Sequence, residues 1–80
     1  MTENNIKFLI LNYYKKEFDY SYEETIDLIS FDNCSEMIFD EKNNKIRILV
    51  KEGLTSIKYI FKIKNKKIIK VKTKINIENI

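Results

Sequence analysis

Beyond about residue 35 the chain alternates apolar and polar residues almost without interruption, and this pattern constrains the fold most strongly. Successive side chains of a strand point to opposite faces, so alternation indicates strands with one buried and one exposed face. We expect strands over 36–40, 45–51, 57–64 and 69–75. The inward positions are Met37, Phe39, Ile46, Ile48, Val50, Ile57, Tyr59, Phe61, Ile63, Ile69, Val71, Thr73 and Ile75.

The segments between the expected strands are short and have turn chemistry. Residues 41–44 separate the first pair, Gly53 the second and Asn65 the third. Gly53 is the only glycine in the chain and stands where a hairpin requires a positive φ angle. Short turns connect neighbouring strands, so the pattern predicts an antiparallel meander.

Before residue 35 the apolar spacing is mostly helical. A first helix is expected over 3–18, with Thr2 as its cap and Phe8 on the side away from the core. The run 6–14 is also rich in strand-forming residues, so a strand there is the alternative. The apolar stripe of this helix comprises Ile6, Leu9, Ile10, Leu11, Tyr13, Tyr14 and Phe18.

A second helix is expected over 21–30. Ser21 and Glu24 match a capping box, in which each side chain bonds the backbone N–H of the other residue. Tyr22, Ile26 and Ile29 are expected on its buried side. A sheet with one apolar face needs a cover, and these two helices supply it. The predicted fold is α+β: two N-terminal helices packed on one face of a four-stranded antiparallel meander (ααββββ), forming a two-layer sandwich.

The chain is short enough to be a single domain, 1–80, with an acidic helical part (1–34) and a basic β-meander (35–80). Residues 1–41 hold ten carboxylates and three lysines, whereas residues 42–80 hold eleven lysines and Arg47 against two glutamates. Abundant Lys, Ile and Asn indicate a low-GC genome, so the number of lysines is weak evidence for nucleic-acid binding. Codon usage does not explain their segregation, which points to a charged partner.

Several kinds of site lack their usual residues. The sequence has no histidine, one cysteine and one glycine. We therefore expect no enzyme activity, metal site, cofactor or nucleotide-binding loop. Cys34 is interpreted as a small apolar or incidental thiol. It can form no intramolecular disulfide, and no apolar run is long enough for a membrane span. We therefore expect a cytoplasmic location, either in the organism that encodes the protein or in an infected host cell.

Alternation also predicts a basic face on the sheet, turned away from the helices. If apolar residues pair across the hairpins, Lys62 lies opposite Lys70 and Lys58 opposite Lys74, where like charges repel. An anionic partner would relieve that repulsion; protection of exposed strands from aggregation is the alternative explanation. Ile38, Leu49, Ile60 and Ile68 are expected among the lysines. The candidate partner-binding residues are Arg47, Lys58, Ile60, Lys62, Lys70, Lys72 and Lys74.

A second candidate surface is acidic, and it comprises Asp19, Glu23, Glu24 and Asp27. A solvated helix face explains these residues, and an acidic patch that docks into a basic groove is the alternative. The tyrosines at 13, 14, 20 and 22 are expected to pack where the helices join, with an aromatic contact patch as the alternative.

These observations favour a small non-enzymatic binding protein. The leading hypothesis is an inhibitor or regulator of the kind carried by phages and mobile elements, which docks on a larger nucleic-acid-handling protein. The analogy with anti-CRISPR proteins is one of size and style only. The alternatives are a DNA- or RNA-binding protein that contacts phosphates through the basic face, and a self-associating structural protein such as a homodimer.

Overall fold

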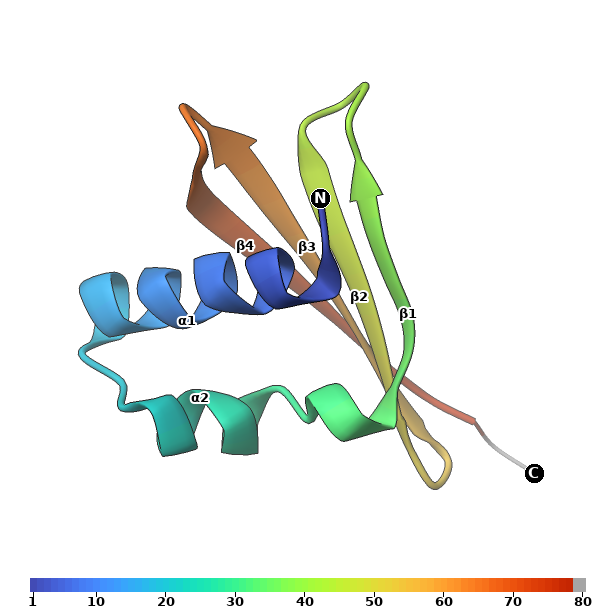
Figure 1. Ribbon diagram of the computed structural model, residues 1–80. Coiled ribbons are helices and arrows are strands. Elements are labelled where there is room, and N and C mark those ends of the chain that lie inside the picture. Colours follow the sequence, from blue (N-terminus) through green and yellow to red (C-terminus); the bar gives the residue numbers. More distant parts are fainter. Residues whose placement is uncertain (79–80) are drawn as a thin grey trace.

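The computed structural model describes residues 1–78 and shows two helices followed by a four-stranded antiparallel sheet (Figure 1). The strand order β1-β2-β3-β4 makes the sheet a meander. The predicted α+β, two-layer fold is confirmed; residues 79 and 80 of the predicted β part lie outside the described residues. The elements are α1 (Glu3–Phe18), α2 (Tyr22–Leu28), a short 3-10 helix η1 (Phe31–Asn33), β1 (Cys34–Asp40), β2 (Lys45–Glu52), β3 (Thr55–Lys64) and β4 (Lys67–Ile77).

Helix α1 begins and ends with local caps. The Asn5 N–H donates to Thr2 Oγ1 at 3.2 Å, as the sequence predicts. At the other end Asp19 adopts a left-handed conformation with φ 56°. Its N–H donates to Lys15 O at 3.1 Å. The segment 6–14 lies within this helix, so the alternative of a strand is wrong, and the buried residues of α1 are Ile6, Ile10 and Tyr14.

Helix α2 has the predicted capping box between Ser21 and Glu24. Its buried side consists of Thr25 and the C-cap residue Ile29, whereas Tyr22 is 62% exposed. The prediction of a buried Tyr22 is therefore wrong. Tyr20, in the corner before the helix, packs in its place and stacks on Tyr14 with ring centroids 6.0 Å apart. Tyr20 thus supplies the aromatic contact at this end of the core.

The strands turn on residues that adopt positive φ angles. Gly53 has a φ of 59°, as expected. Asn65 and Lys66 have φ angles of 53° and 62°, the signature of a two-residue type I′ turn. This turn twists in the same sense as the flanking strands and fixes the register of the longest hairpin.

The register of β3 and β4 confirms one part of the predicted pairing and corrects another. Tyr59 lies opposite Thr73, and Phe61 lies opposite Val71. Toward the turn, however, Lys62 pairs with Lys70 while Ile63 pairs with Ile68, so Ile69 is an extra residue in β4. This bulge reverses the two isoleucines, because a shift of one residue moves a side chain to the opposite face. Ile69, predicted inward, is 48% exposed, and Ile68, predicted among the lysines, is buried in the core.

The core lies between the inner face of the sheet and the two helices. Ile10, Ile29, Ile46, Ile48 and Phe61 are fully buried there. The Tyr59 hydroxyl donates to the Leu28 carbonyl at 3.0 Å and so joins the end of α2 to the sheet.

The helices cover only part of the inner face. Ile75 and Ile77 follow the inward parity of β4, yet they are 66% and 62% exposed. Figure 1 shows the C-terminal end of β4 running away from α1. The end of this strand is therefore an apolar segment without a cover.

Candidate interaction surface

The outer face of the sheet, turned away from the helices, is a regular array of side chains. Strand pairing places these residues in three rows that run from β1 to β4. The rows are Asp40, Lys45, Lys62, Lys70; Ile38, Arg47, Ile60, Lys72; and Glu36, Leu49, Lys58, Lys74.

Charge changes sign across this array. Its β1 column is acidic at Glu36 and Asp40, and its β4 column consists of lysines alone. The whole β3–β4 segment, residues 55–77, contains eight lysines and no carboxylate. The basic part of the outer face is therefore the β3–β4 hairpin, with an acidic border at β1.

Lysines oppose lysines directly across the ladders. Lys62 lies between Lys45 and Lys70, and Lys58 lies opposite Lys74. Pairs of opposite charge at such positions stabilise a sheet by about 0.2–1 kcal/mol each, whereas like charges directly opposite are destabilising. These lysine pairs therefore do not stabilise the fold.

Arg47 lies at the centre of the array, half-buried between Ile38 and Ile60. Its Nε is buried and has no hydrogen-bond partner within the described residues. Hydrogen bonds from the Asn43 side chain and backbone lower the pKa of the Asp40 carboxyl, and the charge of Arg47 lowers it further. The two Asn43 donors lie 2.8 Å and 3.2 Å from the Asp40 carboxylate oxygens, so this acid also holds the β1–β2 turn.

All seven residues predicted for the partner-binding site lie on the outer face. The sheet brings Arg47, Ile60 and Lys72 into one row and adds the pairs Lys62–Lys70 and Lys58–Lys74. Lys45 was outside the predicted site although it completes a row of three lysines. Alternation already placed Lys45 outward, but its position beside Lys62 depends on the β2–β3 register. Ile68 does not contribute to this face, because of the bulge at Ile69.

The predicted acidic residues lie in the helical layer and not on the outer face. Asp19 forms the C-cap of α1 and Glu24 belongs to the capping box of α2. Glu23 and Asp27 are exposed one helical turn apart on α2. Helix capping thus gives two of the four residues a structural role.

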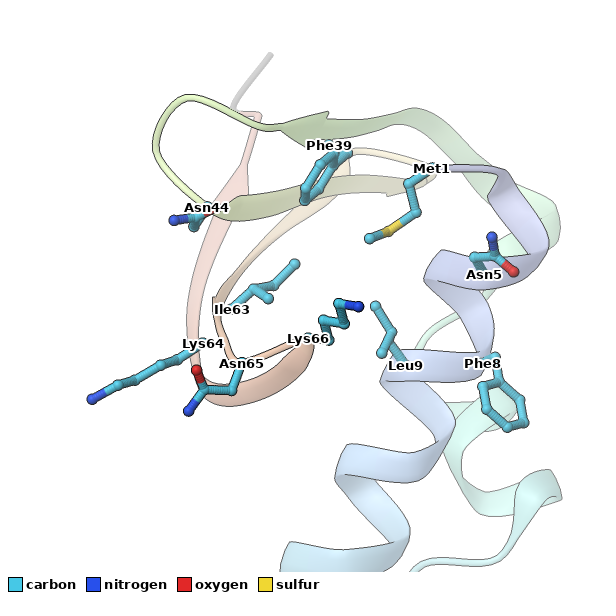
Figure 2. Close-up of a pocket in the computed structure, with 10 residues that line it drawn as sticks. All are labelled: Met1, Asn5, Phe8, Leu9, Phe39, Asn44, Ile63, Lys64, Asn65 and Lys66. Carbon is cyan, nitrogen blue, oxygen red and sulfur yellow. The ribbon is translucent and has the colours of Figure 1, made fainter.

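A groove separates the start of α1 from the β1–β2 and β3–β4 turns, and sequence reasoning missed it (Figure 2). Its volume is about 680 Å³. Leu9, Ile63 and Phe39 form apolar walls, and the Lys66 side chain extends between the first two. The only feature of the sequence that pointed to this groove is Phe8, an apolar residue on the outer side of α1 that is 64% exposed.

The aromatic residues of the helical part pack as a cluster. Tyr14 stacks on Tyr20 and meets Phe61 edge to face, with the centroids of the latter pair 6.4 Å apart. Burial raises the pKa of Tyr14 to about 12, and the neighbouring tyrosines 59, 13 and 20 add to the shift. Tyr14 and Tyr20 therefore serve the core, while the exposed Tyr22 is apart from them.

Further observations concern the part of the chain that the structure describes. Within residues 1–78 no group of three or more His, Cys, Asp or Glu side chains could hold a metal ion. No helix in this range is long and apolar enough to cross a membrane. The half-buried Cys34 packs against the core, and its Sγ lies 2.9 Å from the Glu36 carbonyl oxygen.

Comparison with protein-family models, curated proteins and solved structures found no match for this chain.

Proposed function

We propose that the protein is a non-enzymatic binding protein that docks its outer sheet face on an acidic surface of a larger protein. The observation that carries the proposal is the composition of the array. Ile38, Ile60 and Leu49 border the central Arg47, and lysines occupy the other two β3 positions and all three β4 positions. Apolar residues and arginine inside a charged rim are the usual anatomy of a protein–protein interface.

Two energetic features support an anionic partner. Carboxylates placed on the outer face would remove the repulsion within the Lys62–Lys70 and Lys58–Lys74 pairs. They would also offer acceptors to the Arg47 guanidinium, whose Nε is without a partner in the described part of the chain. Both gains occur only in the complex, so they favour association over the free state.

In this proposal the chain acts by occupying a surface, as small inhibitors and regulators carried by phages and mobile elements do. A larger nucleic-acid-handling protein is the partner we propose. On such a protein the outer face would occupy an acidic surface, because the basic surfaces that contact nucleic acid would repel its lysines. The partner would be present in the cytoplasm of the cell in which the protein is made.

The test compares two variants of equal charge change. Lys62→Glu alters the centre of the lysine array, and Lys42→Glu alters the exposed β1–β2 turn. Affinity capture from extracts of the source organism should recover a stoichiometric partner with the natural protein and with Lys42→Glu, and lose it with Lys62→Glu. Equal recovery by both variants, or no partner at all, contradicts the proposal.

A second candidate function is binding of a nucleic-acid backbone, and the lysine rows favour it. The row Lys45–Lys62–Lys70 and the pair Lys58–Lys74 could neutralise several phosphates. Base-specific reading is not expected, because Arg47 is the only arginine and the array has no aromatic residue for stacking. Titration of labelled duplex and single strands at low and moderate salt should then show affinity that falls steeply with salt. Absence of binding at low salt excludes this function.

A further inference from the structure

The free edge of β4 offers backbone groups that docking on the outer face does not involve. Strand β4 borders β3 on one side only, and its 11 residues make it the longest strand of the sheet. Proteins protect exposed edges with short strands, proline, bulges or charge. Here the chain contains no proline, and the bulge at Ile69 lies near one end of the strand. A regular stretch from Lys70 to Ile77 is left, with lysine as its only protection.

Hydrogen bonding shows which backbone groups face this edge. The Glu78 N–H donates to the Leu54 carbonyl at 2.9 Å, so residue 78 bonds toward β3. In an antiparallel ladder the direction alternates from one residue to the next. Lys70, Lys72 and Lys74 therefore bond toward β3. The N–H and C=O groups of Val71, Thr73 and Ile75 point to the free edge.

The side chains beside this edge differ on its two faces. Lys70, Lys72 and Lys74 project from the outer face at successive positions of the same parity. On the inner face Ile75 and Ile77 are 66% and 62% exposed because no helix covers them. A strand that completes this edge needs negative charge on one face and apolar side chains on the other.

We propose that the free edge of β4 accepts an extended segment of a partner protein as a fifth strand, and that this segment alternates acidic and apolar residues. Its backbone would pair with Val71, Thr73 and Ile75. Its carboxylates would lie beside the lysines, and its apolar side chains beside Thr73, Ile75 and Ile77. This is recognition by strand addition, in which the backbone gives affinity and the alternate side chains give specificity.

Charge argues against β4 as its own partner. Two antiparallel β4 strands would bring the lysines of one copy beside those of the other on the outer face, which is unfavourable. From Lys70 toward the β3–β4 turn, the strand borders a second groove of about 850 Å³ beside α1. This groove is lined in part by Tyr13, Lys16 and Ile69. This groove leaves room for an end of the added segment.

The inference does not rest on the proposed function, because it needs the free backbone groups of β4, which docking on the outer face does not involve; the two surfaces share Lys70, Lys72 and Lys74. Substitution at Thr73 changes the edge and leaves the outer-face lysines in place. Lys62→Glu changes the outer face and leaves the edge amides free. Failure of one proposal is thus distinguishable from failure of the other.

The probe is a capped seven-residue peptide of alternating Val and Glu, with a Val–Lys peptide as the control of opposite charge. Titration into isotope-labelled protein should slow amide exchange at Val71, Thr73 and Ile75 and leave Lys72, which already bonds toward β3, unchanged. The Val–Lys peptide should bind at least tenfold more weakly. Unchanged exchange at the three edge amides overturns the proposal.

Thr73→Pro and Thr73→Val form a matched pair of variants. Proline removes an N–H that points to the free edge and leaves the ladder to β3 intact, whereas valine keeps the N–H. The peptide should bind Thr73→Val normally and Thr73→Pro at least tenfold more weakly, with similar melting temperatures. Equal binding by both variants contradicts the proposal.

A third variant covers the case in which the proline variant does not fold. Changing Lys70, Lys72 and Lys74 together to Glu should reverse the preference from the Val–Glu to the Val–Lys peptide; an unchanged preference overturns the proposal. Sedimentation of the natural protein gives a separate outcome. Self-association that Thr73→Pro abolishes would show that a second copy of this chain occupies the edge, and the proposal of a foreign acidic strand would be wrong.

Discussion

The two faces of the sheet are made by the same strands, yet they differ in burial and in charge. On the inner face Ile46, Ile48 and Phe61 are fully buried, and each is followed or preceded by an outer-face residue that is not. On the outer face lysines oppose lysines across the ladders. In the proposed function, adjacent residues thus divide between stability and recognition. Substitutions at neighbouring positions should separate the two properties.

Removal of one large side chain from each face tests this difference with the largest expected effect on stability. Phe61→Ala deletes a fully buried ring and should lower the free energy of unfolding by about 3–5 kcal/mol. Ile60→Ala, at the adjacent half-buried position, should cost about 1 kcal/mol or less. Urea denaturation followed by circular dichroism measures both. Similar losses for the two variants would show that the outer face also carries stability.

Alkaline pH tests the environment of the inner layer. The folded protein holds Tyr14 at a pKa of about 12, above its ordinary value of 10.0, because burial favours the neutral phenol. This contribution to stability is complete below pH 10 and is lost as the pH rises through 12. Between pH 9 and pH 12 the natural protein should therefore lose roughly 2 kcal/mol more than Tyr14→Phe does. Tyr22→Phe, at an exposed position, is the control and should follow the natural protein.

Loss of the hydrogen bond that joins α2 to the sheet should have a smaller effect on the free energy of unfolding. Tyr59→Phe keeps the buried ring but removes the hydrogen bond to the Leu28 carbonyl. The free energy of unfolding should fall by about 1 kcal/mol. Amide exchange at Ile29, the C-cap of α2, should become faster, because the end of this helix loses its tie to the sheet. Unchanged exchange at Ile29 would show that apolar packing alone holds α2.

A charge reversal on the outer face should change stability least, and it should raise stability where the other substitutions lower it. Lys62→Glu places a carboxylate between Lys45 and Lys70, so two repulsive pairs become attractive. Stability should rise by about 0.5–1 kcal/mol, while Lys42→Glu in the exposed turn should change it little. Thermal denaturation at low and high salt measures the difference, which salt should reduce. Destabilisation by Lys62→Glu would mean that the lysines support the fold itself.

Most of the fold could be predicted from the sequence because its signals are local and agree with one another. The starts of the two helices are indicated by capping residues within one turn, namely Thr2 for the first helix and Ser21 with Glu24 for the second. Gly53 indicates a hairpin. Alternation then sets the register, because a slip by one residue would expose the whole apolar set. For the same reason membership of the outer face was predictable for Lys58 and Lys62.

The predictions of buried residues that were wrong concern pairs of nearby residues that are equally suited to the core. Ile68 and Ile69 are identical side chains of opposite parity, and only the bulge in the completed hairpin decides which is buried. Tyr20 and Tyr22 pose the same ambiguity at the corner between the helices. The row Lys45–Lys62–Lys70 and the groove beside Leu9 depend on tertiary pairing. No pattern within a single segment could reveal them.

The meander also determines the order in which the molecule can be assembled. Every ladder joins strands that are consecutive in the chain, and the connecting loops 41–44, 53–54 and 65–66 have two to four residues. Closing such short loops costs little entropy, and local topology of this kind folds fast. The helices, in contrast, need the inner face of strands that the ribosome makes after them. During synthesis α1 therefore lacks its main contact with the sheet until β4, the last strand, has emerged.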